Sequence, residues 1–350
     1  MNRFFRPLAV LALMASTPLA SVRSASAETI RWLTQTQQQN AQYPVEIGVI
    51  NALGSKGFTI QRNEFQVLGL NLADALRTAS SGAFQVVTTQ IGSVAKDDPF
   101  LEGVDLIGVS TDMGELRKAV EVYREPFNAR LAERFGVKAV AIWPFGPQVF
   151  FCNQPIKSLA DLKGQKVRSF TASMSSLLTD LGATPVTLSF PEVYSALERG
   201  VASCGVTSPT SANTGKWPEV TNHLLPLSVS GSVQAHIVNL DWWNKLPADR
   251  RAALESEFKA LEQGLWDLAV TTNDKALACS TGGECAPGLY TPYKMTLVAV
   301  SEADKGKIKQ IATDKILGEW AGRCASTFPD CAKVWNGSIG AALGLKIASK

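Results

Sequence analysis

The sequence is poor in the residues and motifs that most often carry catalysis. Among 350 residues there are 2 histidines, His223 and His236, and their separation does not match a metal-binding pair. No two cysteines have the short Cys-x-x-Cys spacing typical of zinc and redox sites. There is no Gly-x-Ser-x-Gly turn, no Walker loop and no Gly-x-Gly-x-x-Gly element. We therefore expect neither a metal nor a cofactor.

Long apolar runs are also missing after the N-terminus. Two arginines precede an apolar stretch at residues 7–15, which is shorter than the roughly 20 residues that a membrane-spanning helix needs. The small residues Ala25-Ser-Ala27 fit a signal-peptidase site. We therefore predict a signal peptide over 1–27, cleavage after Ala27 and export to the periplasm.

Excess charge of either sign is absent from the predicted mature chain. The full sequence has 34 Lys+Arg and 31 Asp+Glu, and 3 of the arginines lie in the predicted signal peptide, which leaves 34 − 3 = 31 basic residues against 31 acidic ones. Partners such as nucleic acid or an anionic membrane need clustered basic residues. The balance therefore argues against a nucleic-acid partner. The remaining length, about 320 residues, favours two lobes, and we expect a monomer.

The six cysteines form an even set, as expected for a chain exported to an oxidising compartment. Several pairings are possible in principle. Short spacings favour Cys279 with Cys285 and Cys324 with Cys331, which leaves Cys152 for Cys204. We therefore predict three structural disulfides.

Strand-like and helix-like patterns alternate along the chain, which is typical of α/β proteins with parallel or mixed sheets covered by helices. Strands are predicted at residues 29–33, 58–63, 84–89, 137–143, 149–153, 166–170, 186–188, 204–207, 235–239 and 295–300. Helices are predicted at residues 43–53, 72–78, 117–135, 174–181, 192–199 and 247–278, followed by two short helices at the C-terminus. We interpret residues 97–106 as a loop and residues 208–216 as a segment that crosses between the lobes.

Four short motifs occur in order in the central part of the chain. They are Asp161-Leu-Lys-Gly164 with Lys166-Val-Arg168, Leu181-Gly-Ala-Thr-Pro185, Glu192-Val-Tyr-Ser-Ala-Leu-Glu-Arg-Gly-Val201 and Trp243-Asn-Lys-Leu-Pro247. In order and spacing these motifs resemble those of the extracytoplasmic solute-binding proteins of tripartite ATP-independent periplasmic (TRAP) transporters, the DctP-type family. The resemblance covers roughly the central third of the chain.

The resemblance implies an α/β, two-lobed periplasmic-binding-protein (flytrap) fold. Two mixed sheets flanked by helices would be joined by hinge strands and a long helix, and the lobes would close over one organic anion. Ligands usually bind in a cleft of this kind. The expected segments are lobe I at 28–146, lobe II at 147–233, a return to lobe I with the long helix at 234–273, a return to lobe II at 274–305, and C-terminal helices at 306–350.

The same resemblance makes Arg168 the clamp for a ligand carboxylate, because the family's most frequent ligand contact is the arginine of this strand. The planar fork of a guanidinium matches the two oxygens of a carboxylate. Two features depart from the family. Gln148 stands where sialic-acid-type members have another arginine, and the strand within Gly200–Val206 lacks the family's Asp and Glu. The identity of the acid therefore stays open.

Further ligand contacts are predicted around the expected cleft. Gln148 would exchange hydrogen bonds with the ligand, and Phe145 lies beside it at the first crossing. The other candidates are Thr207 and Ser208 at a strand end, Trp217 on the expected crossing segment, Gln35 and Gln37 after the first strand, and His236 near the second crossing. For His236 the alternative is a histidine buried in the core.

The sequence thus predicts a periplasmic binding protein, without catalytic activity, that delivers a small organic acid to the small and large membrane subunits of a TRAP permease. One alternative is an exported lyase or hydrolase that uses acidic residues scattered along the chain. Another is a ligand-binding input to a sensory receptor. Stabilisation by a ligand that is not consumed would separate a binder from an enzyme.

Overall fold

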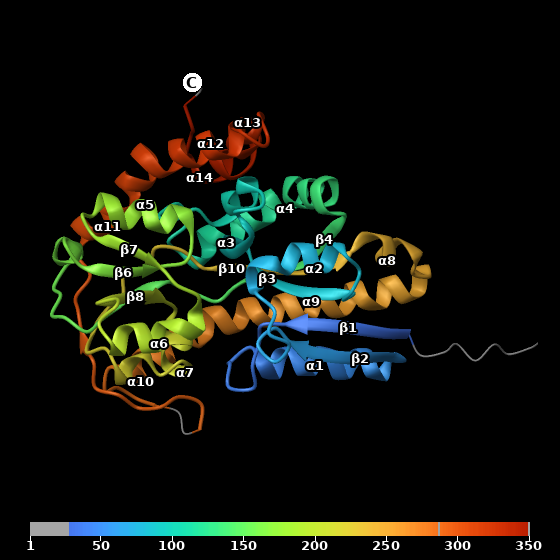
Figure 1. Cartoon of the computed structure of the whole chain (residues 1–350), viewed down its shortest axis with the longest axis horizontal. Helices are drawn as coiled ribbons and strands as arrows, with labels where there is room; N and C mark the ends of the chain where they lie inside the picture. The colour runs from blue at the N-terminus through green and yellow to red at the C-terminus, as the bar shows by residue number, and fades with distance from the viewer. Residues whose placement is uncertain (1–27, 286–287, 349–350) are drawn as a thin grey trace, which may run out of the picture.

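The computed structural model describes residues 28–285 and 288–348, so the predicted signal peptide lies outside the described residues (Figure 1). The described chain forms two mixed β-sheets with helices packed on them, which confirms the predicted fold class. In the described residues no helix combines the length and the apolar character that a membrane span requires.

Sheet 1 has five strands in the order β2-β1-β3-β10-β4. β1 runs parallel to β2 and β3, whereas β10 is antiparallel to β3 and β4. Every residue of β10 is buried, because helices cover both faces of the sheet. The strands are β1 (Glu28–Thr34), β2 (Phe58–Glu64), β3 (Val86–Gln90), β4 (Val137–Pro144) and β10 (Val233–Asn239). The helices of this half are α1 (Tyr43–Ser55), α2 (Ala75–Ser80), α3 (Ile91–Val94), α4 (Met113–Phe135), α8 (Leu240–Lys245) and α9 (Ala248–Thr271).

Sheet 2 has six strands in the order β11-β9-β5-β8-β6-β7. β6 is parallel to β7 and β8, and β5 is antiparallel to β8 and β9. The strands are β5 (Val149–Cys152), β6 (Lys166–Ser169), β7 (Thr184–Thr187), β8 (Cys204–Thr207), β9 (His223–Leu225) and β11 (Thr296–Leu297). The helices beside them are α5 (Ala172–Asp180), α6 (Phe190–Glu198), α7 (Pro209–Thr214) and α10 (Asn273–Ser280). Short 3-10 turns occur at Leu72–Asp74, Leu159–Leu162 and Trp217–Glu219.

Two extended segments connect the sheets, and they lie side by side. Residues 145–148 lead from β4 to β5, and residues 226–232 lead from β9 to β10. The Phe145 N–H donates to the Ser232 carbonyl, and the Gln148 N–H donates to the Ser230 carbonyl at 2.9 Å. We call these two segments the hinge strands.

The predicted single helix over residues 247–278 is interrupted. α9 packs on β4 and α1, and α10 packs on α7 of the other half, so the break at Thr272 is a third passage between the sheets. The Asn273 side chain donates to the Ala269 carbonyl at 2.8 Å and accepts from the Thr210 N–H. Such side-chain bonds compete with the helical backbone bonds and redirect the chain. Figure 1 shows α9 running along sheet 1 toward α10.

Residues 208–216 do not cross between the lobes as predicted. They form α7, which begins here because Ser208 caps it by accepting from the Ser211 N–H and Pro209 occupies its first turn. α7 packs on α10 in the half that contains sheet 2. Residues 97–106 are also not a plain loop. They contain a 3-10 helix, Pro99–Asp105, whose first turn is capped by Asp98.

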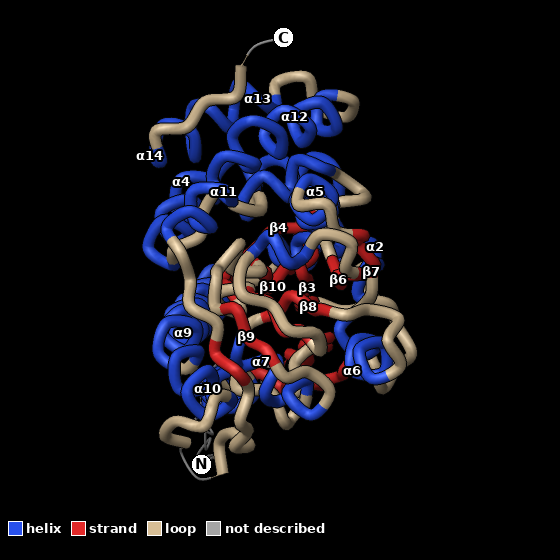
Figure 2. The backbone as a smooth tube through the Cα atoms, turned by 90° about the vertical axis from the view of Figure 1, so that its left-hand side faces the viewer, coloured by secondary structure: helices blue, strands red, loops and turns tan. Residues whose placement is uncertain are grey.

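The C-terminal part is more extensive than the two short helices predicted. It contains α11 (Glu302–Ile311), α12 (Leu317–Ala325), α13 (Cys331–Trp335) and α14 (Ala341–Leu343), with π-helical turns at Ala312–Ile316 and Asn336–Gly340. α11 packs on α5 of one half and α14 packs on α4 of the other. Figures 1 and 2 show α12, α13 and α14 together at the end of the molecule where the C-terminus lies, and α11 below them beside α5. The C-terminal helices thus contact both halves.

The structure contains three disulfides, and they join the pairs that the spacing predicts. Cys152 and Cys204 face each other on the neighbouring strands β5 and β8, 52 residues apart in sequence. Cys279–Cys285 and Cys324–Cys331 close loops of 6 and 7 residues.

The Cys152–Cys204 disulfide is expected to contribute most to stability, because it closes the longest loop. On the loop-closure estimate, Cys152→Ala/Cys204→Ala costs about 4 kcal/mol in the free energy of unfolding, and Cys279→Ala/Cys285→Ala costs about 2 kcal/mol. Urea unfolding of the two double variants tests this order. Equal losses, or a larger loss from the short loop, would contradict it.

Candidate functional site

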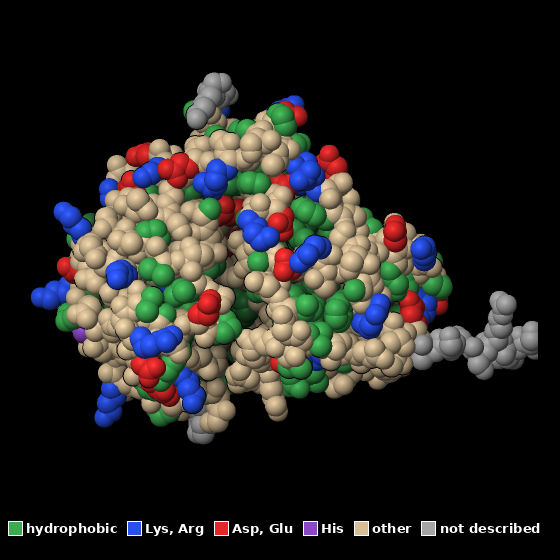
Figure 3. All heavy atoms as spheres, in the orientation of Figure 1, with side chains coloured by type: hydrophobic (Ala, Val, Ile, Leu, Met, Phe, Trp, Pro, Cys, Tyr) green, Lys and Arg blue, Asp and Glu red, His purple; other side chains and the backbone are tan. Residues whose placement is uncertain are grey.

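A cleft lies between facing edges of the two sheets. The carboxyl ends of β1 and β3 meet the start of the antiparallel β10 at one edge, and the ends of β6 and β8 meet the start of β5 at the other. Ligands of α/β proteins commonly bind outside such strand ends. The cavity between the edges has a volume of about 1010 Å³. Figure 3 shows the surface hollowed between the two halves.

Amides, phenyl rings and a few charged groups line this cleft. The rings come from Phe65 on one side, Phe170 and Phe190 on the other, and Phe145 at the hinge. The lining glutamines are Gln35, Gln37, Gln66, Gln90 and Gln148. The lining therefore offers apolar contact area together with many hydrogen-bonding groups.

Arg168 is the buried cation of the cleft wall. Its side chain leaves the middle of β6 and is 3% exposed. Nε donates to the Leu188 carbonyl at 3.1 Å and Nη1 donates to the Val206 carbonyl at 2.8 Å. The guanidinium carbon lies 4.6 Å from the centre of the Phe170 ring. These contacts fix the guanidinium plane and leave its remaining N–H groups toward the cleft that Arg168 lines.

The charge of Arg168 has no acidic partner within the described residues. The other cations of the lining are paired, Lys96 with Asp97 at 2.9 Å and Arg323 with Glu102 at 3.2 Å. Burial lowers the pKa of Arg168 from its ordinary value to about 9. The guanidinium therefore stays protonated at neutral pH, as an uncompensated positive charge that an anion would neutralise.

The local sequence explains how this arginine reaches its position. Ser158 and Asp161 form a capping box around the turn before β6, and Gly164, with φ of 77°, reverses the chain into the strand. On the neighbouring strand Gly205 leaves room for the Trp217 ring, since an added Cβ would come within 2.6 Å of it. Trp217 in turn packs behind Arg168, with its ring centre 5.9 Å from the guanidinium carbon.

The structure brings six of the predicted residues together around the cleft. Gln35 and Gln37 line it from sheet 1, and the others line it from the hinge and sheet 2, namely Phe145, Gln148, Arg168 and Thr207.

Three predicted residues do not line the cleft. The Ser208 hydroxyl caps α7, Trp217 lies beneath Arg168 and Phe190, and His236 lies inside sheet 1. Each of these three side chains is at most 1% exposed. Trp217 was predicted as a wall of the cleft on a crossing segment, but that segment is α7 and the following turn, which face sheet 2.

His236 belongs to a buried polar cluster behind the sheet 1 wall. Because an indole nitrogen only donates, the bond of 3.1 Å from Trp143 Nε1 makes Nδ1 of His236 the acceptor and leaves the ring proton on Nε2. Nε2 lies 3.9 Å from Glu46 Oε2. Burial raises the pKa of Glu46, but His236, Arg62 and Thr34 together hold it below its ordinary value. His236 is therefore a histidine buried in the core, the alternative named above, and not a ligand contact.

Several lining residues were missed by sequence reasoning. Gln90 ends β3, Phe170 directly follows β6, and Phe190 begins α6 after a capping box. A rule that takes the last residue of each predicted strand and the residue after it would have found Phe170 and Gln90. Glu102 and Arg323 had no such signal, because their place in the lining depends on the packing of the C-terminal helices.

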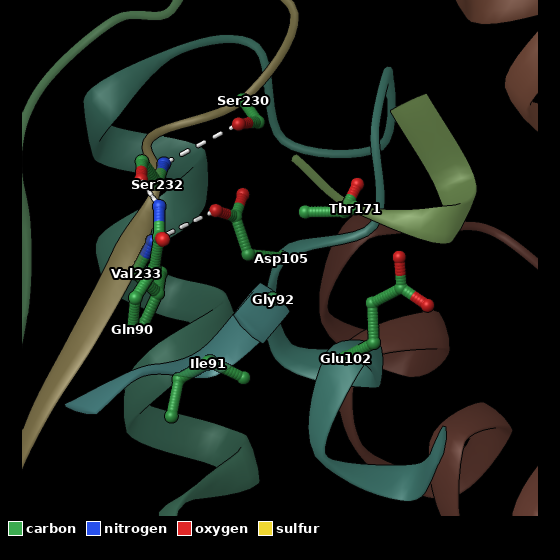
Figure 4. A pocket seen from close by; sticks show the side chains of 9 residues that line it. All are labelled: Gln90, Ile91, Gly92, Glu102, Asp105, Thr171, Ser230, Ser232 and Val233. Atoms are coloured by element: carbon green, nitrogen blue, oxygen red, sulfur yellow. Dashed lines mark hydrogen bonds between the residues drawn. The ribbon is translucent and has the colours of Figure 1, made fainter. Parts of the chain in front are cut away.

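Asp105 anchors the second hinge strand below the cleft. Its carboxylate accepts from the Gly231 N–H at 3.2 Å and the Val233 N–H at 2.9 Å, on either side of Ser232, whose φ is 54°. Figure 4 shows this carboxylate beside a small cavity of about 10 Å³, which is room for one water. Burial raises the pKa of Asp105 from 3.8 to about 7, against the lowering effect of the backbone donors.

Within the described residues, no group of three or more His, Cys, Asp and Glu side chains is arranged to share a metal ion.

Comparison with known proteins places the chain among binding proteins. The family described as bacterial extracellular solute-binding protein, family 7 (DctP), matches residues 68–285. The C4-dicarboxylate-binding periplasmic protein of Rhodobacter capsulatus is 29% identical over 209 residues, 58% of this chain and 62% of the relative. The sialic acid-binding periplasmic protein of Vibrio cholerae is 27% identical over 173 residues, 49% of this chain and 54% of the relative. Each alignment thus spans less than two thirds of the relative.

Solved structures show the same fold at low sequence identity. The ectoine-binding protein of the TeaABC TRAP transporter of Halomonas elongata superposes with a TM-score of 0.78 at 17% identity, over 91% of this chain and 99% of that one. A Bordetella pertussis solute receptor that binds pyroglutamic acid gives a TM-score of 0.76 at 18% identity, over 88% and 99%.

Two arginines are buried in the described part of the chain, Arg130 and Arg168, and their comparison tests what Arg168 is for. Arg130 is 5% exposed and pairs with the buried Asp98 at 2.6 Å, so Arg130→Met should cost about 3–5 kcal/mol in the free energy of unfolding. Arg168→Met removes a buried charge without an acidic partner, and the ligand-free variant should lose less than about 1 kcal/mol. Urea unfolding of both ligand-free variants measures these two losses of stability. A loss at Arg168 as large as that at Arg130 would assign Arg168 to stability.

The raised pKa of Asp105 predicts a pH dependence of a definite sign. Between 3.8 and about 7 the folded protein keeps a proton that the unfolded chain releases, so this contribution to stability is present at low pH and lost as the pH rises through about 7. Asp105→Asn removes the titration. The stability of the wild type relative to this variant should therefore fall from pH 4 to pH 7 in urea unfolding. A difference that stays constant, or that rises, would contradict the assignment.

Proposed function

Because the chain belongs to family 7 of the bacterial extracellular solute-binding proteins, we propose that it captures a small organic acid in its cleft and delivers it to a membrane permease of the TRAP type. The proposal rests on the guanidinium of Arg168, which is buried, is held by two main-chain carbonyls and has no acidic partner among the described residues. A carboxylate that accepts two parallel N–H bonds from it would balance the charge of this buried guanidinium. Because the other lining cations are paired, we propose that one carboxylate of the ligand is bound in this way.

Binding is proposed to close the cleft. A volume of about 1010 Å³ is at the upper end of the range for small-molecule pockets, and a small acid fills only a fraction of it. The lobes that move would be those predicted from the sequence, at 28–146 with 234–273 and at 147–233 with 274–305. The paired hinge strands and the break at Thr272 are the points at which backbone rotation is needed.

The rims of the cleft support such a closure. The loop after β2 exposes Val67 (78%), Leu68 (46%) and Leu70 (39%), and Leu70 lines the cleft. Phe190 and Pro191 line the cleft on the other side. Closure that brings these apolar groups together would remove them from water and stabilise the liganded state.

Location and partners follow from the same proposal. We propose that residues 1–27 direct export and are cleaved after Ala27, and that the mature monomer meets a small and a large permease subunit in the periplasm. Relatives named as periplasmic binding proteins and neighbours named as TRAP solute-binding proteins support this role. We propose no catalytic step, since binding and release account for the function.

The test uses a thermal-shift screen of mono- and dicarboxylates, keto acids and aromatic acids, followed by calorimetry on the best binder. Arg168→Ala should weaken that binder by roughly 2–5 kcal/mol, about 30- to several-thousand-fold, because its carboxylate loses the buried partner. Arg168→Lys should also bind poorly, because a point charge cannot make the two-pronged contact. Unchanged affinity in both variants would refute the proposed site. Turnover of the acid would instead favour an exported enzyme.

A further inference from the structure

Two glutamines of the cleft, Gln148 and Gln35, have orientations fixed by their hydrogen bonds, and these orientations constrain the ligand. An amide side chain has one end that donates and one that accepts, and its orientation follows from the partners it meets. Main-chain carbonyls only accept, so an amide beside one must turn its NH₂ group toward it. Two such carbonyls, those of Gly146 and Ser232, lie on the hinge strands.

Gln148 is oriented by the first of these carbonyls. Its Nε2 donates to the Gly146 carbonyl at 2.8 Å. Its Oε1 accepts no hydrogen bond from the described residues. This oxygen is also not fully enclosed by protein. Because Gln148 lines the cleft, we take its Oε1 to face the cleft. Turning the amide over would set two oxygens against each other. Gln148 therefore offers the ligand an acceptor.

Gln35 is oriented through a relay from the second carbonyl. Gln234 Nε2 donates to the Ser232 carbonyl at 2.9 Å, which turns Gln234 Oε1 toward Gln35. Gln35 must then use its own Nε2 to donate to Gln234 Oε1. Its Oε1 is left toward the cleft without a donor from the described residues. Two lobes thus present amide oxygens to the same space.

Gln90 shows that this property is not shared by every lining glutamine. Its Nε2 donates to Ser232 Oγ at 3.0 Å and its Oε1 accepts from Ser93 Oγ at 2.8 Å. Both ends of this amide are already occupied by the protein. Gln90 lines the cleft as a neutral wall.

The two free oxygens lie close to the carboxylate clamp in the architecture. Gln148 immediately precedes Val149, which pairs with Thr207, and the Val206 carbonyl next to Thr207 holds Arg168. Gln35 follows β1 on the facing edge of sheet 1. An acid held by Arg168 would therefore have an acceptor beside it on sheet 2 and another across the cleft.

Building on the proposed function, we infer that the ligand is an organic acid with hydroxyl or N–H donors next to its carboxylate, and that Gln148 and Gln35 select for those donors. A 2-oxo acid has only acceptors at this position, so its carbonyl would meet the amide oxygens with no proton between them. A buried acceptor left without a donor opposes binding. The specificity of the cleft would then rest on the hinge carbonyls that orient these amides.

Matched acids that differ in one group test this inference. Calorimetry at neutral pH measures the affinity for each enantiomer of a hydroxy acid and for the matching oxo acid. The three pairs are mandelate and phenylglyoxylate, 2-hydroxyisocaproate and 2-oxoisocaproate, and lactate and pyruvate. In the pair that fits the cleft best, the better hydroxy enantiomer should bind about 10- to 100-fold more tightly than the oxo acid. Equal affinity, or a preference for the oxo acid, would overturn the inference.

Variants assign the selection to residues. Gln148→Met keeps the side-chain length and removes the acceptor. It should weaken binding of the hydroxy acid and should not weaken binding of the oxo acid, because the opposing amide oxygen is gone, so the ratio of the two affinities falls. Gln35→Met should act in the same direction. Gln90→Met is the matched control and should preserve the ratio, because both ends of that amide are occupied.

The oxo acid also reports on folding, since it still needs Arg168. A ratio that survives both Gln148→Met and Gln35→Met, with the oxo acid still bound, would overturn the inference and leave the carboxylate site intact. Failure of every acid to bind the wild-type protein would overturn the proposed function together with it.

Discussion

The structure depends on one costly arrangement, a guanidinium buried without an acid. Two main-chain carbonyls and an aromatic ring hold Arg168, but none of these neutralises it, and burial lowers its pKa to about 9. A charge kept in such a place is stabilised fully only when an anion arrives. The capping box, the turn at Gly164 and the space at Gly205 serve to hold this one group at the edge of sheet 2.

The hinge strands connect this charge to the rest of the cleft. They carry the chain between the sheets, and they supply the carbonyls of Gly146 and Ser232 that orient the amides of Gln148 and Gln35. Asp105 fixes the backbone on either side of Ser232. The same few residues thus set the path between the lobes and the pattern of acceptors that the ligand meets.

Sequence reasoning found the parts of the site that local motifs determine. Arg168 was singled out by a short motif of neighbouring residues that resembles the family's, and the alternating patterns predicted parallel or mixed sheets. The break at Thr272 and the position of α7 could not be seen, because side chains such as Asn273 make their deciding contacts with distant segments. The burial of Trp217 and His236 could not be seen either, because it also results from contacts with distant segments. The orientation of Gln35 depends on Gln234, which lies 199 residues away in the sequence.

The central claim is that a ligand carboxylate neutralises Arg168 between the two sheets. A crystal structure of the protein with the tightest-binding acid tests it most directly. We expect the carboxylate to accept from the Arg168 guanidinium at about 2.8 Å, within a cleft narrower than the one described above. An acid held elsewhere, with no anion beside the Arg168 guanidinium, would contradict the account.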